Sequence, residues 1–141
     1  MVRYDKIKKI MEVEEMSQRI LIIDAKIENN ELLLSTDIET GLGDFAPTGQ
    51  MLVDSDQLSF IYILDKEDGY HYITIPAGTW NVIQEGLQSG LETYLSNNGG
   101  KLKLDGFHSE MKYLIENING NSNYGEEMVT KVEQVFAAPS A

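Results

Sequence analysis

A chain of 141 residues, 42% apolar and 24% charged, is large enough to bury one hydrophobic core and too apolar to be disordered throughout. Its formal net charge of −12 argues against binding to nucleic acid or anionic lipid, because like charges repel. The chain contains no cysteine, which excludes disulfides, thiolate zinc sites and cysteine nucleophiles.

The first fifteen residues differ in composition from the rest and allow two interpretations. If residues 11–13 are encoded as AUG-GAG-GUG, the message carries a purine-rich ribosome-binding sequence just before the Met16 codon, and translation starts there. Otherwise the segment forms a short helix with Tyr4, Ile7 and Met11 on one face. We predict an N-terminal extension over residues 1–15, disordered or preceding the true start, and a single α+β domain over residues 16–141.

The next part of the chain predicts a hairpin followed by a loop. Branched residues dominate Ile20 to Ile27, Glu28 to Glu31 supply turn chemistry, and Leu32 to Leu34 resume the apolar run. Residues 37–49 contain three glycines and a proline without periodicity, which indicates a loop leading into Gly49 to Asp56.

Two further hairpins are predicted downstream. Leu58 to Leu64 and Tyr70 to Ile75 are β-type runs, and the acids and glycine between them suit a tight connection. Leu91 to Ser96 and Lys101 to Leu104 flank Asn97 to Gly100 in the same manner.

Helical spacing appears in three places. Trp80, Ile83 and Leu87 recur after Thr79, a candidate N-cap. Two longer apolar stripes follow: Phe107, Met111, Leu114, Ile115 and Ile118, then Met128, Val132, Val135 and Phe136. Because hairpins need a second layer to bury one face, we predict a two-layer α+β fold, with about three helices on a mainly antiparallel sheet.

Two polar blocks are candidate ligand sites, each with a structural alternative. Clustered carboxylates at 54 to 56 suit magnesium or calcium, but such side chains also cap or turn a chain. The polar loop at 119 to 124 suits a small polar ligand, but such loops also join helices. The candidate ligand-binding residues are Gln50, Asp54, Ser55, Asp56, Asn119, Asn121, Asn123 and Tyr124.

Catalytic patterns are not evident. His71, between Tyr70 and Tyr72, invites an acid–base site, but an aromatic strand surface explains that cluster as well. His108 lies far from it in sequence, no serine has a nucleophile-elbow context, and no phosphate-loop pattern follows the glycines. We predict no catalytic residue, no metal and no cofactor.

Several blocks of the chain resemble a small uncharacterised family of conserved proteins from Bacillus, Staphylococcus and related Firmicutes. They are GQMLVDSD at 49–56, Phe60 and Tyr62, Thr79 with Trp80, and Asn117 to Met128. The resemblance implies a cytoplasmic protein of unknown function that begins near Met16, and it supplies no catalytic residue or cofactor.

The sequence therefore favours a cytoplasmic, non-catalytic binding or regulatory module that contacts a protein partner through its acidic surface. No apolar run approaches the roughly 18 residues of a membrane span, so we expect neither a membrane nor a nucleic-acid partner. The alternative is a metal-assisted hydrolase, or a binder of small polar ligands, that uses Asp54, Asp56 and the loop at 119–124.

Overall fold

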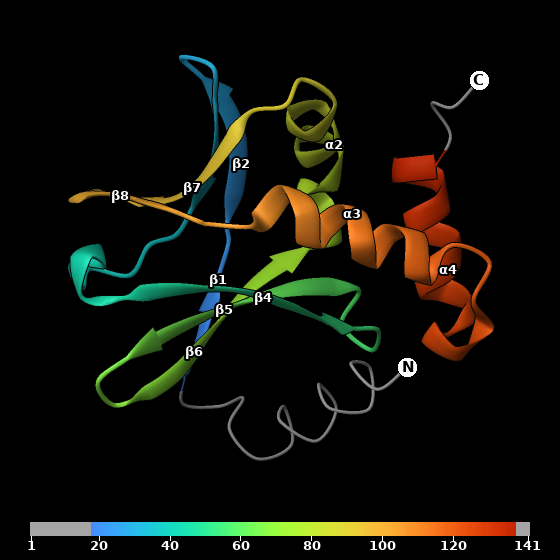
Figure 1. Cartoon of the computed structure of the whole chain (residues 1–141), viewed down its shortest axis with the longest axis horizontal. Coiled ribbons are helices and arrows are strands. Elements are labelled where there is room, and N and C mark those ends of the chain that lie inside the picture. The colour runs from blue at the N-terminus through green and yellow to red at the C-terminus, as the bar shows by residue number, and fades with distance from the viewer. Residues whose placement is uncertain (1–17, 138–141) are drawn as a thin grey trace.

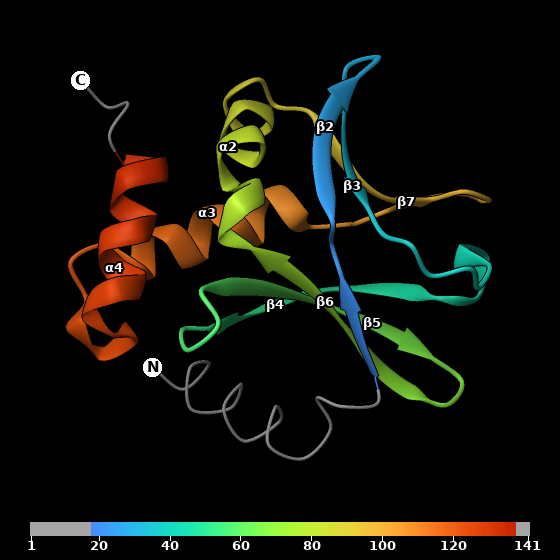
Figure 2. The ribbon, with the colours of Figure 1, turned by 180° about the vertical axis from the view of Figure 1, so that it is seen from behind.

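The computed structural model describes residues 18–137. The predictions for residues 1–15 and for a start at Met16 concern residues outside that range. These residues form two β-sheets and three helices, which confirms the α+β class. Figures 1 and 2 show how the sheets and helices are arranged. The strands divide between two sheets, so the helices meet two sheet faces.

The first sheet has the strand order β1-β6-β5-β4 and the second has β2-β3-β7-β8. Each contains one parallel pair, β1 with β6 and β3 with β7, and all other pairs are antiparallel. The strands are β1 (Arg19–Leu21), β2 (Asp24–Glu28), β3 (Glu31–Ser35), β4 (Ala46–Asp54), β5 (Ser59–Lys66), β6 (Gly69–Pro76), β7 (Glu92–Asn97) and β8 (Gly100–Lys103).

The three predicted hairpins are present as β2–β3, β5–β6 and β7–β8. The prediction of one strand over Ile20 to Ile27 was wrong, because the chain changes sheets in the middle of that run. Ile22 N–H donates to Thr74 of β6 at 3.0 Å, whereas Ile23 N–H donates to Ser35 of β3 at 2.8 Å. The backbone N–H groups of two adjacent residues thus form their hydrogen bonds in different sheets.

The loop predicted over 37–49 is wrong at its C-terminal end. A 3-10 turn, η1 (Leu42–Asp44), precedes β4, and β4 pairs with β5 through a bulge between Pro47 and Met51. Gly49 lies in this bulge with φ 76°, where its missing side chain relieves strain. Sequence reasoning therefore missed an entire strand.

Three helices complete the core: α2 (Trp80–Gln88), α3 (Phe107–Ile118) and α4 (Glu126–Val132). Thr79 holds the N-cap position of α2, but its hydroxyl donates to the Pro76 carbonyl at 2.8 Å and caps no helical N–H. The 3-10 turns η2 (Ala77–Thr79) and η3 (Ser122–Tyr124) precede α2 and α4, and a π-helical turn, η4 (Glu133–Ala137), extends α4.

The main core lies where both sheets meet the helices. In Figure 1, α3 runs from the end of β8 across the first sheet toward α4. Apolar residues from all these layers form one cluster, including Leu34 of the second sheet, Phe60 of the first, Trp80 of α2 and Leu114 of α3. Ring centroids of Phe60 and Trp80 lie 5.0 Å apart, and Phe136 of η4 completes an aromatic group with them. This packing fixes the positions of the helices relative to the two sheets.

Candidate functional site

The acidic block at 54 to 56 forms the turn between β4 and β5. Asp54 ends β4, and its Oδ1 accepts a hydrogen bond from the backbone N–H of Gln57 at 3.3 Å. The Ser59 hydroxyl donates to the Gln57 carbonyl at 3.1 Å, and Leu58 takes a φ of 48°. The turn-forming alternative is therefore confirmed for Asp54.

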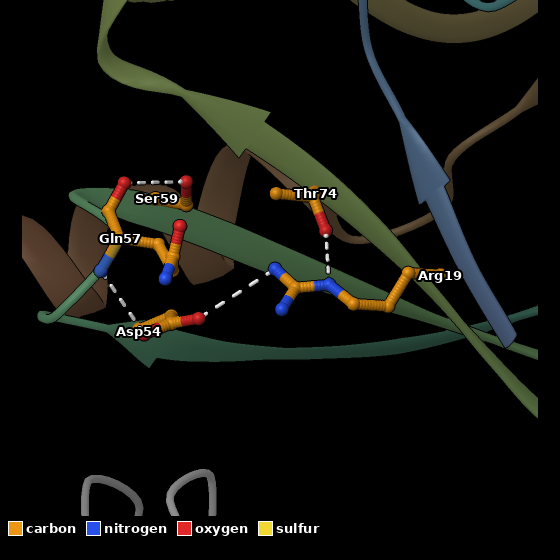
Figure 3. Close-up of polar contacts among 5 residues, drawn as sticks. All are labelled: Arg19, Asp54, Gln57, Ser59 and Thr74. Atoms are coloured by element: carbon orange, nitrogen blue, oxygen red, sulfur yellow. Dashed lines mark hydrogen bonds and ion pairs between the residues drawn. The ribbon is translucent and has the colours of Figure 1, made fainter. Parts of the chain in front are cut away.

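The other carboxylate oxygen of Asp54 faces Arg19, as Figure 3 shows. Arg19 Nη2 lies 3.5 Å from Asp54 Oδ2, and Arg19 Nε donates to Thr74 Oγ1 at 2.9 Å. The Arg19 and Asp54 side chains are 21% and 11% exposed, so water screens their attraction only partly. Because β1 and β4 are opposite edges of the first sheet, this contact joins the two edges. Sequence analysis did not identify Arg19, because no motif links it with Asp54, which lies far along the chain.

The remaining candidates in this block are dispersed. Asp56 is exposed in the turn, and Gln50 lies four residues before Asp54, roughly 13 Å away along an extended strand. Ser55 Oγ is shielded from solvent and has no hydrogen-bond partner among the described residues. Nor do residues 18–137 contain three His, Asp or Glu side chains grouped so as to hold a metal ion.

The polar loop at 119 to 124 builds the connection between α3 and α4. Asn121 Oδ1 accepts from the Asn123 N–H, and Asn121 Nδ2 donates to the Asn117 carbonyl, both at 3.1 Å. Glu133 of η4 accepts from the Gly120 N–H at 2.9 Å, which ties the loop to the C-terminal turn. Tyr124 is only 1% exposed and belongs to the core. Asn119 and Asn123 are exposed and remain free to meet solvent or a ligand.

His71 and Tyr62 both have partners within the fold. His71 Nε2 lies 2.9 Å from Asp68 Oδ1, and its ring meets Phe45 edge-on at 5.1 Å. The hydrogen bond from His71 lowers the pKa of Asp68. Burial raises the pKa of Tyr62 to about 12, and its hydroxyl donates to the Asp105 carbonyl at 2.5 Å. Tyr62 is thus a neutral hydroxyl that holds the start of α3 on the first sheet.

A hollow of about 750 Å³ is lined by the β4–β5 turn, η2, α4 and η4. We call it the acidic groove; its lining residues are Leu58, Ala77, Glu126, Glu127, Thr130, Lys131 and Gln134. Leu58 and Glu126, which each lie two residues beyond the polar blocks at 54–56 and 119–124, both line this hollow. The eight predicted ligand residues do not line this hollow.

A second hollow of about 540 Å³ lies between α2, α3 and η4. We call it the helix groove; its lining residues are Gln84, Leu87, Gln88, His108, Lys112, Ile115, Glu116, Asn119 and Phe136. Of the predicted ligand residues, only Asn119 belongs to it. One signal was available in the sequence: His108, Lys112 and Glu116 recur every four residues, on a helix face beside the apolar stripe.

The family of the chain follows from comparison with known proteins. Residues 20–136 match a family described as "Family of unknown function (UPF0738)". The chain belongs to this family. A UPF0738 protein of Bacillus licheniformis is 40% identical over 121 residues, and the UPF0738 protein YjbL of Bacillus subtilis is 38% identical over 121 residues. In both cases the alignment covers 86% of this chain and 99% of the relative.

Membership in the UPF0738 family confirms the resemblance carried by the signature blocks, and the match with a UPF0738 protein of Bacillus mycoides, 37% identical over 124 residues, agrees with it. No solved structure matches this chain. Among residues 18–137, none of the helices has both the length and the apolar character needed to cross a membrane.

Proposed function

We propose that this protein is a non-catalytic binding module whose acidic groove receives a basic segment of a protein partner. The observation that carries the proposal is the composition of the groove. Two exposed carboxylates, Glu126 and Glu127, stand beside the apolar side chains of Leu58 and Ala77. A segment that combines lysine or arginine with an apolar residue complements both parts of this surface.

The charge of the whole chain supports the same kind of partner. A net charge of −12 attracts a basic protein over a distance and accelerates its encounter with the groove. Lys131 lies one helical turn beyond Glu127 and lines the same groove. Its ammonium group would repel a misplaced basic residue, so it would set the position of the bound segment.

The test compares two variants that change net charge equally. Glu126→Gln with Glu127→Gln removes the carboxylates of the groove, whereas Glu67→Gln with Glu85→Gln removes two exposed carboxylates elsewhere. Each protein is crosslinked in native lysate, the captured partner is identified, and its affinity is measured at about 50 mM and about 500 mM NaCl. We expect the groove variant to lose the partner, the control to keep it, and the affinity to fall with salt. Equal capture by both variants would refute the proposal.

The alternative that uses Asp54, Asp56 and the loop at 119–124 stays a hypothesis with less support. A metal ion at Asp54 has to compete with Arg19 for the carboxylate. Thermal unfolding with added Mg²⁺, Ca²⁺ or Mn²⁺ tests it, because a ligand of the folded state raises the unfolding midpoint. We expect no rise. A rise that Asp54→Asn or Asp56→Asn abolishes would instead favour the metal site.

A further inference from the structure

The helix groove combines a rigid apolar floor with a rim that carries a lysine. Phe136 is 6% exposed and is held by ring contacts with Trp80 at 5.7 Å and Phe60 at 6.1 Å. The π-helical turn η4 carries Phe136 into this position, and such turns occur often at functional sites. Leu87 and Ile115 line the same groove. The floor is therefore formed before any ligand arrives, which lowers the entropic cost of binding.

The rim contains a lysine, Lys112, that has no ion-pair partner among residues 18–137. Most basic side chains within residues 18–137 have partners: Arg19, Lys26, Lys101 and Lys103 pair with carboxylates, and Lys66 lies over the Phe45 ring. Across that same range, Lys112 has no carboxylate within ion-pair distance and is exposed at the groove. An ammonium group left unpaired in so acidic a protein is available to an incoming anion.

His108 adds a second polar group at the same end of the groove. Its Nε2 lies 2.8 Å from the Leu87 carbonyl oxygen, which only accepts hydrogen bonds, so Nε2 carries the proton. Nδ1 then accepts a hydrogen bond in the neutral ring and donates one in the protonated ring. The other polar side chains at the groove are Gln84 and Gln88 of α2, and Glu116 and Asn119 of α3. Glu116 lies one turn beyond Lys112, so the positive charge at the groove is on Lys112, at the end nearer His108.

We propose that the helix groove binds a small amphipathic carboxylate, an organic acid whose hydrocarbon body packs on Leu87, Ile115 and Phe136 while its carboxylate pairs with Lys112. The volume of about 540 Å³ lies within the usual range for small-molecule sites. This site differs from the acidic groove in lining residues and in the charge of its ligand, so the two proposals stand or fall separately.

The test measures binding of three probes with the same hydrocarbon chain to the full-length protein: sodium octanoate, octan-1-ol and octylammonium chloride. Titration with ¹⁵N-labelled protein reports both the affinity and the residues affected. We expect saturable octanoate binding with shifts at Leu87, Ile115 and Phe136, and weaker binding of the neutral and cationic probes. Absence of saturable octanoate binding, or equal affinity for all three probes, would overturn the proposal.

Variants separate recognition of the carboxylate from simple hydrophobic binding. Lys112→Gln should weaken octanoate binding about tenfold while leaving octan-1-ol binding unchanged, because a charge-assisted hydrogen bond is lost. Lys112→Arg should retain most of the affinity. Lys103→Gln, which removes an exposed lysine outside both grooves, is the matched control and should leave octanoate binding unchanged. An unchanged unfolding midpoint verifies the fold of each variant. An equal loss in the control would contradict the assignment.

A free acid and a membrane lipid both present acyl chains with anionic groups, so vesicles distinguish the two sources. Cosedimentation with phosphatidylglycerol vesicles should recover no protein, since the net charge of −12 opposes approach to an anionic surface. Vesicle binding that depends on Lys112 would overturn the assignment to a free acid.

Discussion

The two sheets have the same number of strands and one parallel pair each, yet their outer faces are built differently. On the second sheet this face carries charges: Lys101 pairs with Glu31, and Lys103 with Glu92 at 3.2 Å. The Lys101 ammonium group also lies 4.5 Å above the Tyr94 ring. Such cross-strand pairs are typical of a sheet face that meets water.

The corresponding face of the first sheet is apolar. Leu52, Ile61, Ile63 and Tyr72 form a cluster of their own, separate from the main core, and are between 0% and 6% exposed. One end of the cluster borders the polar contact of Arg19 with Asp54 and Thr74. The central strand β5 is therefore buried on both faces, which explains its continuous apolar sequence from Phe60 to Leu64. The comparison teaches that burial stabilises one outer face, whereas the other carries exposed ion pairs that contribute little to stability.

The largest effect is expected for Ile61→Ala in the outer cluster of the first sheet. Deleting a fully buried isoleucine side chain removes transfer free energy and leaves a cavity, at a cost of about 2 to 5 kcal/mol in the free energy of unfolding. Urea denaturation monitored by circular dichroism measures it, with Ile73→Ala of the main core as the reference. A loss under about 1 kcal/mol would show that the outer cluster is not a true core.

A smaller loss is expected when the contact between Arg19 and Asp54 is broken. Arg19→Gln leaves a carboxylate that is only 11% exposed without its cation, which should cost about 1 to 3 kcal/mol. A double-mutant cycle with Asp54→Asn isolates the pairing from the role of Asp54 in the turn. Additive losses would mean that the two side chains do not stabilise each other.

Tyr62, on the inner face of the first sheet, gives a pH-dependent effect. Its pKa of about 12 in the folded protein exceeds the ordinary tyrosine value of 10.0. Between these two values the unfolded state binds fewer protons at this group than the folded state does. Stability therefore falls as the pH rises from about 10 to about 12, and is fully retained below that window.

Tyr62→Phe tests this pH dependence. The variant should lose about 1 to 2 kcal/mol at neutral pH, because the Asp105 carbonyl loses its donor. It should also show a shallower decline in alkaline solution. Urea denaturation at pH 8 and at about pH 11 measures both effects. The same alkaline slope with and without the hydroxyl would mean that other groups cause the decline.

The smallest effect is expected on the outer face of the second sheet. Lys103→Gln breaks an exposed pair with Glu92, whose hydrogen bond raises the pKa of Lys103. Water and salt screen this attraction, so the unfolding midpoint should barely change and the difference should vanish at high ionic strength. Melting curves with and without added salt measure it. A loss comparable to that of Ile61→Ala would remove the contrast between the two faces.

Local patterns in the sequence predicted several hairpins and helices of the fold, and they also indicated the family. The hairpins β5–β6 and β7–β8 were predictable because turn residues and alternating strands lie close together in the chain. The apolar stripes of α3 and α4 follow from helical periodicity, and the signature blocks at 49–56 and 117–128 gave the family. The acidic composition likewise comes from the sequence alone.

Only the tertiary structure decided the features that require contacts between residues far apart in the sequence. The change of sheet between Ile22 and Ile23 requires partners at Thr74 and Ser35, and no pattern within Ile20 to Ile27 indicates it. The contact of Arg19 with Asp54 joins opposite edges of one sheet. The two grooves arise only where separate helices and turns pack together. Periodicity specifies which face of an element is buried, whereas long-range backbone pairing and packing decide which elements it meets.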